Sequence, residues 1–149
     1  LPRVRSLRTE KGASIMMLDI DNFESINDNW GHLVGDRVIL AVVDIIKDSI
    51  RDNDIFARLG GEEFGLLLPD TDGKQAIAVA ERIRQNVQQR TGPGYHYALP
   101  VKVTLSIGVC SAIQNNVNSY DIMRDADEAL YEAKHNGKNR IVTRQAECS

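Results

Sequence analysis

The sequence is poor in cysteine and proline and has no long hydrophobic run. Two cysteines in 149 residues, Cys110 and Cys148, exclude a disulfide scaffold and favour a reducing, cytoplasmic compartment. Four prolines and eleven glycines without a repeat exclude collagen-like and low-complexity chains. Apolar runs such as Ile15–Leu18 and Phe64–Leu68 are far shorter than the ~20 residues that cross a bilayer. We therefore expect no membrane contact by this segment.

The charge balance is slightly acidic, with 18 Lys and Arg against 21 Asp and Glu and a formal net charge of −3. This balance argues against nucleic acid as a partner, because such binding needs a concentrated basic face. The length and the 42% hydrophobic content predict one globular domain over residues 1–149. The chain opens on Leu1-Pro2 instead of Met, so we expect a fragment of a longer protein.

Hydrophobic periodicity predicts a mixed chain of helices and strands. Alternating or continuous apolar runs indicate strands, and apolar residues three and four apart indicate helices. Gly31 and Gly137 are expected to end helices. The expected elements are a lead-in helix in Leu1–Lys11, a strand Ala13–Ile20, a helix Asp21–Asn29, a loop to Gly35, a helix Asp36–Ile50, a hairpin of Asp54–Leu59 and Glu63–Leu68, a helix Thr71–Gln89, one or two strands in Tyr97–Ala112, a helix Ser119–Asn136 with Ser119 as N-cap, and an edge strand Asn139–Val142.

Four acids lie where the expected strands end or turn. Asp19 and Asp21 flank Ile20 at the end of the first strand, and Glu62 and Glu63 lie in the hairpin turn. If the strand lies beside the hairpin, Asp19 and Glu62 converge. With the Ile20 carbonyl they could then hold Mg²⁺, which prefers oxygen ligands and the phosphates of a substrate. The alternative is that each acid is solvated surface.

The hairpin glycines, Gly60 and Gly61, have two interpretations. A tight turn favours residues that tolerate positive φ, and glycine is the usual choice. The missing Cβ atoms could also let a bulky ligand approach the backbone closely. Spacing alone does not separate the two.

Several basic residues are candidates for binding phosphate or a base. Lys134 and Lys138 flank the end of the last helix, where cations also interact favourably with the helix dipole. Arg51, with Asp54, and Arg58 precede the hairpin turn. The arginines form either ordinary surface ion pairs or bidentate contacts to a guanine edge or phosphate.

The ordered set of short motifs resembles one family, the GGDEF domain of diguanylate cyclases, in a GGEEF variant. The similarity runs in order over almost the whole chain, and the joint occurrence of the blocks makes chance agreement implausible. The matching blocks are Asp19-Ile20-Asp21-Asn22-Phe23, Ile26-Asn27-Asp28, Gly31-His32, Gly35-Asp36, Arg58-Leu59-Gly60-Gly61-Glu62-Glu63-Phe64, Thr104-Leu105-Ser106-Ile107-Gly108, Ala126-Asp127-Glu128-Ala129-Leu130-Tyr131-Glu132-Ala133-Lys134 and Gly137-Lys138-Asn139-Arg140.

The resemblance implies an α/β (α+β) palm-like nucleotidyl cyclase fold with a central, mostly antiparallel five-stranded sheet flanked by helices. It implies condensation of two GTP molecules into cyclic di-GMP plus pyrophosphate across a homodimer. Each 3′-hydroxyl would attack the α-phosphate of the other nucleotide, with help from Mg²⁺ or Mn²⁺. It also implies a regulatory domain elsewhere in the parent chain, which could be anchored to the inner membrane.

The resemblance assigns roles to individual residues. Asp19, the Ile20 carbonyl and Glu62 match the metal ligands. Glu62 also matches the proposed proton acceptor, and Glu63 supports the site. The substrate-binding matches are Asn27 and Asp36 for guanine, His32 near the nucleotide pocket, Phe23 and Glu24 at the terminal phosphates, and Lys134 and Lys138 on the triphosphate.

The spacing of Arg51 and Asp54 before Gly60 matches the site at which cyclic di-GMP binds as an inhibitor, and Arg58 is a possible further contact. Glu24 stands where the family often has Lys, and Lys138 where Arg is frequent. Two alternatives stay open. One is a weak or inactive domain that acts as a cyclic di-GMP or GTP receptor, and the other is a cyclase that makes mononucleotide products.

Overall fold

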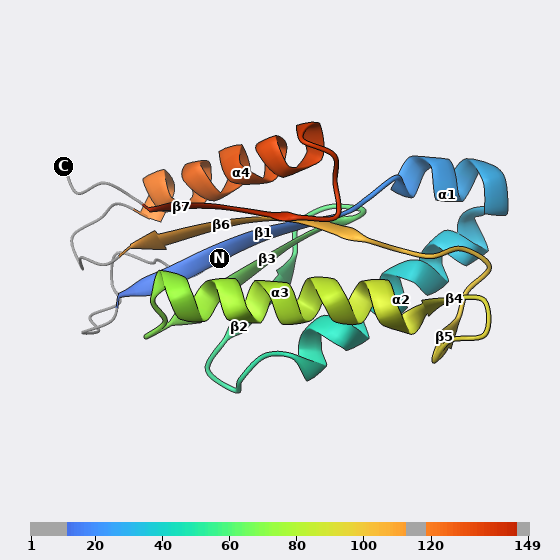
Figure 1. Cartoon of the computed structure of the whole chain (residues 1–149), viewed down its shortest axis with the longest axis horizontal. Helices are drawn as coiled ribbons and strands as arrows, with labels where there is room; N and C mark the ends of the chain where they lie inside the picture. The colour runs from blue at the N-terminus through green and yellow to red at the C-terminus, as the bar shows by residue number, and fades with distance from the viewer. Residues whose placement is uncertain (1–11, 113–118, 146–149) are drawn as a thin grey trace.

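The computed structural model describes residues 12–112 and 119–145. Within these residues the chain forms four helices and seven strands, whose arrangement is shown in Figure 1. The elements are β1 (Ala13–Ile20), α1 (Phe23–Trp30), α2 (His32–Asp48), β2 (Ile55–Arg58), β3 (Glu63–Pro69), α3 (Gly73–Arg90), β4 (Thr91–Gly92), β5 (Tyr97–Ala98), β6 (Leu105–Ala112), α4 (Ser119–His135) and β7 (Ile141–Gln145).

Five of the strands form the central sheet, in the order β2-β3-β1-β6-β7. All neighbours are antiparallel except β6 and β7, which are parallel. β4 and β5 form a separate two-stranded pair. The predicted mostly antiparallel five-stranded sheet with flanking helices is therefore confirmed.

β1 lies at the centre of the sheet and is buried along its whole length. Since successive side chains of a strand point to opposite faces, its apolar residues divide between two cores. Met16 and Leu18 pack in the core that contains α2 and α3 residues, whereas Ile15 and Met17 pack with α4 residues. Figure 1 shows the same layers, with α4 on one side of the sheet and α2 and α3 on the other.

One expected loop is wrong. α2 begins at His32, so the segment that leads to Gly35 is helical. Gly31 alone separates the two helices, because its φ of 89° and ψ of 162° lie outside the helical region. It follows the last residue of α1 and directly precedes α2. A single residue with positive φ is enough to separate the two helices, because glycine adopts this conformation without strain.

Other boundaries differ by a few residues for local reasons. α3 starts at Gly73 because Asp72 caps it, accepting from the Gln75 N–H at 2.8 Å. β7 starts at Ile141, since Asn139 has a left-handed φ of 46°. The expectations for Leu1–Lys11 lie outside the described residues, as does the segment that would test Ser119 as N-cap.

No helix in residues 12–112 and 119–145 is long and apolar enough to cross a membrane.

Candidate functional site

The acids at the end of β1 and in the hairpin are brought together by the pairing of β1 with β3. Asp19 lies opposite Glu63 in this ladder, and the Ile20 N–H donates to the Glu62 carbonyl at 3.1 Å. Glu63 is the first residue of β3, which agrees with the expected strand Glu63–Leu68 but not with the expectation that it lies in the turn. The adjacency of strand and turn predicted from the sequence is thus present.

Asp19 is buried and lacks part of the bonding that a carboxylate needs. Its Oδ2 forms an ion pair with Lys134 Nζ at 2.8 Å, but its buried Oδ1 has no hydrogen-bond partner among residues 12–112 and 119–145. Burial raises the pKa of Asp19 above its usual value, and the Lys134 ammonium offsets this only in part. An unsatisfied buried carboxylate oxygen is costly, so this atom is a candidate cation ligand.

Glu63 adds a further acid to this end of the sheet. Burial raises the pKa of Glu63, and the nearby carboxylates of Asp127 and Asp19 raise it further. Within residues 12–112 and 119–145, no group of three or more His, Cys, Asp or Glu side chains is arranged to hold a metal ion. A site of two carboxylates and one carbonyl still fits Mg²⁺, which keeps several waters and is completed by substrate phosphates.

The interpretation of Gly60 and Gly61 through positive φ is wrong, because neither residue has it. A Cβ at Gly61 would meet nothing within 4 Å, and one at Gly60 would meet only Glu63 Cβ, at 3.9 Å. Arg58 holds this turn, since its guanidinium donates to the Gly60 and Gly61 carbonyls at 3.1 and 2.8 Å. The space above the glycines is therefore open to a ligand.

A surface depression of about 570 Å³ lies beside the acids. The N-terminus of α1 enters it, and Asn22 supplies no side-chain cap there. The first N–H groups of a helix lack intrahelical partners and attract anions. The depression is lined by Ile20, Asn22, Phe23, Glu24, Ser25, Asp28, Asn29, Glu62, Lys134 and Lys138.

The lining brings together six residues that the sequence had singled out, from three separate parts of the chain: Ile20, Phe23, Glu24, Glu62, Lys134 and Lys138. It also contains Asn22, which sequence reasoning missed. The Asn22 Oδ1 accepts from Lys138 Nζ at 2.6 Å, and its φ of 57° is left-handed. The available signal was an asparagine directly after a strand, because asparagine tolerates this conformation better than most residues.

The expected guanine-binding residues lie on α1 and α2, outside the lining of this depression. Asn27 is half-buried, and its Oδ1 has no hydrogen-bond partner. Gly35 packs directly against this amide, whereas Asp36 and His32 are exposed. The prediction of a loop position for His32 is wrong, since it is the first residue of α2.

Gly35 was not expected to matter, yet a Cβ built there would overlap Asn27 Oδ1 and lie 3.0 Å from its Cγ. If Asn27 contacts guanine, as the resemblance implies, Gly35→Ala should lower the affinity for GTP about tenfold, the effect of displacing one buried hydrogen-bonding group. Calorimetric titration with a non-hydrolysable GTP analogue measures this. Stability should not fall, because alanine favours a helix by about 1 kcal/mol over glycine.

The control is the same substitution in an Asn27→Ala background, where the smaller side chain leaves room for the methyl group. Gly35→Ala should then change the affinity no further. An equal loss in both backgrounds would show that Gly35 does not act through Asn27.

Arg51 and Asp54 meet away from this depression, at the turn before β2. Their side chains form an ion pair at 3.0 Å, and the Arg51 N–H donates to Asp54 Oδ2 at 2.8 Å. The Arg51 guanidinium also donates to the Pro69 carbonyl and to Thr71 Oγ1. The Asp54 side chain is 2% exposed and the Arg51 side chain 56% exposed, so the pair presents an oriented guanidinium to solvent. Its bonds with Asp54 raise the pKa of Arg51.

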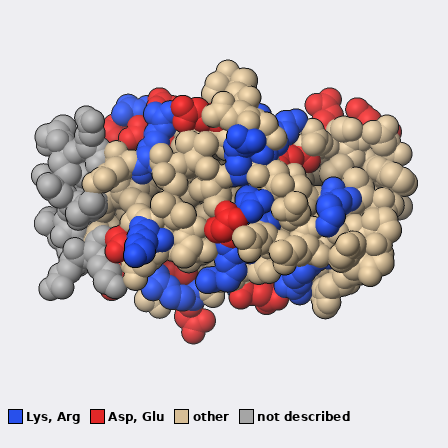
Figure 2. All heavy atoms as spheres, in the orientation of Figure 1, with Lys and Arg blue, Asp and Glu red and all other residues tan. Residues whose placement is uncertain are grey.

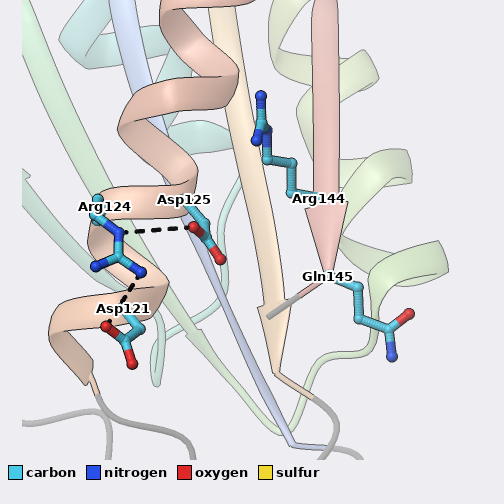
Figure 3. Close-up of a pocket in the computed structure, with 5 residues that line it drawn as sticks. All are labelled: Asp121, Arg124, Asp125, Arg144 and Gln145. Carbon is cyan, nitrogen blue, oxygen red and sulfur yellow. Dashed lines mark ion pairs between the residues drawn. The ribbon is translucent and has the colours of Figure 1, made fainter. Parts of the chain in front are cut away.

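The face drawn in Figure 2 and a second depression, near the start of α4, offer an anionic ligand mixed charges. Figure 2 shows Lys and Arg interspersed with Asp and Glu on one face, without a single basic patch. Figure 3 shows a second depression near the start of α4, in which Arg124 pairs with Asp121 and Asp125. Arg144, which also lines it, pairs with Glu128 and Glu132. These arginines are already neutralised by acids.

Comparison with known proteins agrees with the motif pattern. The model of the family "Diguanylate cyclase, GGDEF domain" matches residues 3–140. The chain belongs to this family. It is 55% identical over 130 residues to the probable diguanylate cyclase DgcT of Escherichia coli, and 45% identical over 129 residues to diguanylate cyclase A of Treponema denticola. These matches cover 87% of this GGDEF domain chain but only 29% and 34% of the relatives, so the chain spans about a third of their length.

Solved structures show the same fold. The GGDEF domain of DgcB from Caulobacter crescentus in complex with c-di-GMP is similar with a TM-score of 0.80 at 32% identity, over 88% of this chain and 77% of that one. The active GGEEF domain of a diguanylate cyclase from Vibrio cholerae is similar with a TM-score of 0.78 at 36% identity, over 92% and 84%. The palm-like α/β fold is therefore shared.

Proposed function

We propose that this GGDEF domain is a diguanylate cyclase that condenses two GTP molecules into cyclic di-GMP and pyrophosphate. The observation that carries the proposal is the convergence of Asp19 and Glu62 beside a depression with two lysines and a helix N-terminus. Named diguanylate cyclases up to 55% identical support it. So does a solved domain described as active whose motif is also GGEEF.

The residues present fit a divalent metal. Asp19 Oδ1, the Ile20 carbonyl and Glu62 would hold Mg²⁺ or Mn²⁺, since all are hard oxygen donors and the first lacks any other partner. When bound, such an ion neutralises triphosphate charge and lowers the pKa of an attacking hydroxyl. The open turn at Gly60 and Gly61 lets the phosphates approach the same backbone.

Glu62 is the proposed proton acceptor. In each half of the reaction the 3′-oxygen of one GTP bonds to the α-phosphorus of the other, the bond from that phosphorus to the β-phosphate oxygen breaks, and pyrophosphate leaves. The 3′-hydroxyl proton passes to the Glu62 carboxylate, which Glu63 supports from the start of β3. Because each 3′-hydroxyl attacks the other nucleotide, two copies of the domain must face each other as a homodimer.

The proposed substrate contacts lie in two places, in the depression and on α1 and α2 outside its lining. Lys134, Lys138 and the first N–H groups of α1, at Phe23 and Glu24, are positioned to bind the triphosphate. Asn27 and Asp36 read the guanine edge, with His32 nearby. The unpartnered Asn27 Oδ1 is the acceptor that a guanine N–H donor requires.

Product analysis tests the proposal. The chain is fused to a dimerising coiled coil, mixed with GTP and Mg²⁺, and the products are separated by chromatography. We expect cyclic di-GMP and pyrophosphate, and neither product after chelation of the metal. A mononucleotide cyclic product would replace the proposal with another cyclase reaction.

A receptor for GTP or cyclic di-GMP is the second candidate function. It is favoured by Glu24, an exposed carboxylate that lines the depression in which the triphosphate would lie. Binding of either nucleotide without turnover in the forced dimer would support the receptor and overturn the cyclase.

We propose that Arg51 and Asp54 bind cyclic di-GMP as an inhibitor, with Arg58 as a further contact. The exposed, oriented guanidinium of Arg51 supports this assignment. The Arg58 guanidinium bonds to the Gly60 and Gly61 carbonyls, so its proposed contact to the product would have to form beside or replace these bonds. Product bound here would hold two domains with their GTP half-sites apart.

Arg51→Ala is expected to raise the cyclic di-GMP concentration needed for half inhibition about tenfold, because it removes charge-assisted hydrogen bonds. Initial rates at increasing product concentration measure the effect. Arg124→Ala is the matched control, since Arg124 is equally exposed (56%) and also pairs with an acid three residues away. Inhibition that is unchanged by Arg51→Ala, or changed equally by both, would remove the assignment.

We also propose that residues 1–149 form one such domain of a longer signalling protein. The short span relative to the curated relatives supports this. A regulatory domain in that protein would control pairing of the two half-sites. The reaction would take place in the cytoplasm.

A further inference from the structure

Asp21 is a buried acid that the proposed chemistry does not use. It lies two residues beyond Asp19, and its carboxylate accepts three hydrogen bonds from distant parts of the chain. Ser106 Oγ donates to Oδ1 at 2.5 Å, whereas Thr104 Oγ1 and the Asn139 N–H donate to Oδ2 at 2.7 and 2.9 Å. The carboxylate therefore connects the end of β1 with the start of β6 and with the turn after α4.

This bonding separates Asp21 from Asp19. Both acids are buried, but Asp19 Oδ1 has no partner, whereas both oxygens of Asp21 are bonded within the protein. Three of the roughly four lone-pair sites of the Asp21 carboxylate are thus used within the protein, which leaves little for a metal ion. The geometry thus assigns Asp21 to the support of the site and not to its ligand set.

The turn that Asp21 holds has an unfavourable backbone. Gly137, Lys138 and Asn139 follow one another with φ of 123°, 63° and 46°. Left-handed conformations cost free energy in residues with a side chain, and they persist only where surrounding contacts impose them. The Lys138 N–H donates to the Ala133 carbonyl at 3.0 Å, which closes the end of α4.

Asn139 is tied on both sides. Its N–H donates to Asp21, and its Oδ1 accepts from Arg84 Nη1 at 2.8 Å. Lys138, the preceding residue, extends its ammonium to Asn22 Oδ1 at 2.6 Å in the depression. Asn22 is itself the residue after Asp21. One carboxylate therefore sets the distance between the Lys138 turn and the start of α1.

We propose that Asp21 is a positioning residue that holds the Lys138 ammonium and the N-terminus of α1 in register for a triphosphate. This inference rests on the proposed function, in which these two elements bind the phosphates of GTP. It explains why an acid so close to the metal ligands has its oxygens bonded to the turn and to β6. It also assigns a role to the turn of Gly137, Lys138 and Asn139, whose backbone has positive φ.

The test is a set of binding measurements on the 149-residue chain, which do not require a catalytic dimer. Titration calorimetry with a non-hydrolysable GTP analogue and Mg²⁺ gives the dissociation constant. Asp21→Asn keeps the size of the side chain but weakens its acceptance of the Asn139 N–H. We expect about a tenfold rise in the dissociation constant, the effect of one charge-assisted hydrogen bond.

A positioning role is distinguished from general destabilisation by combining variants. In a Lys138→Ala background, Asp21→Asn should change the dissociation constant at most about twofold, because the ammonium that it orients is gone. In an Asn27→Ala background, which alters the guanine contact, it should keep its full effect. Equal effects in both backgrounds would overturn the proposal, as would a tenfold rise in the Mg²⁺ concentration needed for binding.

A second variant covers the case in which Asp21→Asn does not fold. Thr104→Val removes one hydrogen-bond donor to Asp21 Oδ2 and keeps the carboxylate. Like Asp21→Asn, it should weaken binding of the analogue, and the effect should disappear in the Lys138→Ala background. Unchanged binding of the analogue by Thr104→Val would then count against Asp21 as a positioning residue. Failure of the proposed function is distinguished by the unsubstituted chain, which would then either bind no GTP analogue or, as a receptor, bind GTP without turnover in the forced dimer.

Discussion

Glu62→Gln is expected to reduce cyclic di-GMP formation by at least about 100-fold, the usual contribution of a positioned general base. The amide keeps the shape of the carboxylate but takes up no proton at neutral pH and binds a divalent cation poorly. Glu62 is half-buried beside Asp19 and lines the depression, so its replacement removes charge where the metal and the 3′-hydroxyl would meet. The measurement is the initial rate of product formation by the forced dimer.

The control is Glu128→Gln, which removes the same charge from an exposed position on α4 where the acid pairs only with Arg144 among the ion pairs of residues 12–112 and 119–145. Its rate should stay within about twofold of the unsubstituted chain, as is usual for surface substitutions. Both variants should keep the thermal unfolding midpoint. A Glu62→Gln rate within threefold of the unsubstituted chain would exclude Glu62 as the proton acceptor and as a metal ligand.

Gly108→Ala is expected to destabilise the domain by about 3 kcal/mol or more, at the upper end of overpacking effects. A Cβ at this position of β6 would overlap the Ala126 carbonyl oxygen and the Leu130 amide nitrogen of α4. These are backbone atoms, so no side chain can rotate away, and the whole helix must move off the sheet. Urea unfolding followed by circular dichroism measures the loss.

Gly61→Ala is the matched comparison, since a Cβ there would meet no atom within 4 Å and the residue does not have a positive φ. Its stability should stay within about 0.5 kcal/mol of the unsubstituted chain. The same methyl group should lower activity, because it occupies the space through which phosphates would approach the turn. Equal stability of the two variants would show that α4 does not require a glycine beneath it.

The glycines of this domain differ in how far their roles could be predicted from the sequence. The functional interpretation of the hairpin glycines agrees with the open space above them. The conformational interpretation failed because β2 ends at Arg58 and β3 begins at Glu63, so the connection is longer than the two-residue turns that require positive φ. The packing roles of Gly108 and Gly35 could not be inferred from their neighbours in the sequence. A glycine that admits a neighbouring backbone or amide can be identified only when the neighbour is in place.

The elements themselves were largely predictable. β1 and the hairpin strands follow from short apolar runs between polar turns, and α2 from its apolar stripe, because burial of one face imposes a period on the sequence. The error at His32 arose because glycine signals flank it on both sides. Gly31 breaks the helix, whereas Gly35 is tolerated inside one to make room for Asn27.

The roles of individual charged residues were less accessible. Asp19 and Asp21 look alike in the sequence, two residues apart at the end of a strand. The structure distinguishes them by their partners, which for Asp21 come from residues 104, 106 and 139. Arg58 likewise bonds to the carbonyls of its own hairpin turn, which composition and spacing do not show.

The sequence by itself determined the order of helices and strands, the family, and the set of acids and cations available for chemistry, because local periodicity and motif spacing are properties of the chain. Only the tertiary structure decided which of those groups share a site. Pairing of β1 with β3 brings residue 19 to residue 62, and the pairing of β6 with both β1 and β7 brings residue 21 to residue 139. Contacts between residues far apart in the chain depend on register and packing, and these exist only once the sheet and α4 have assembled.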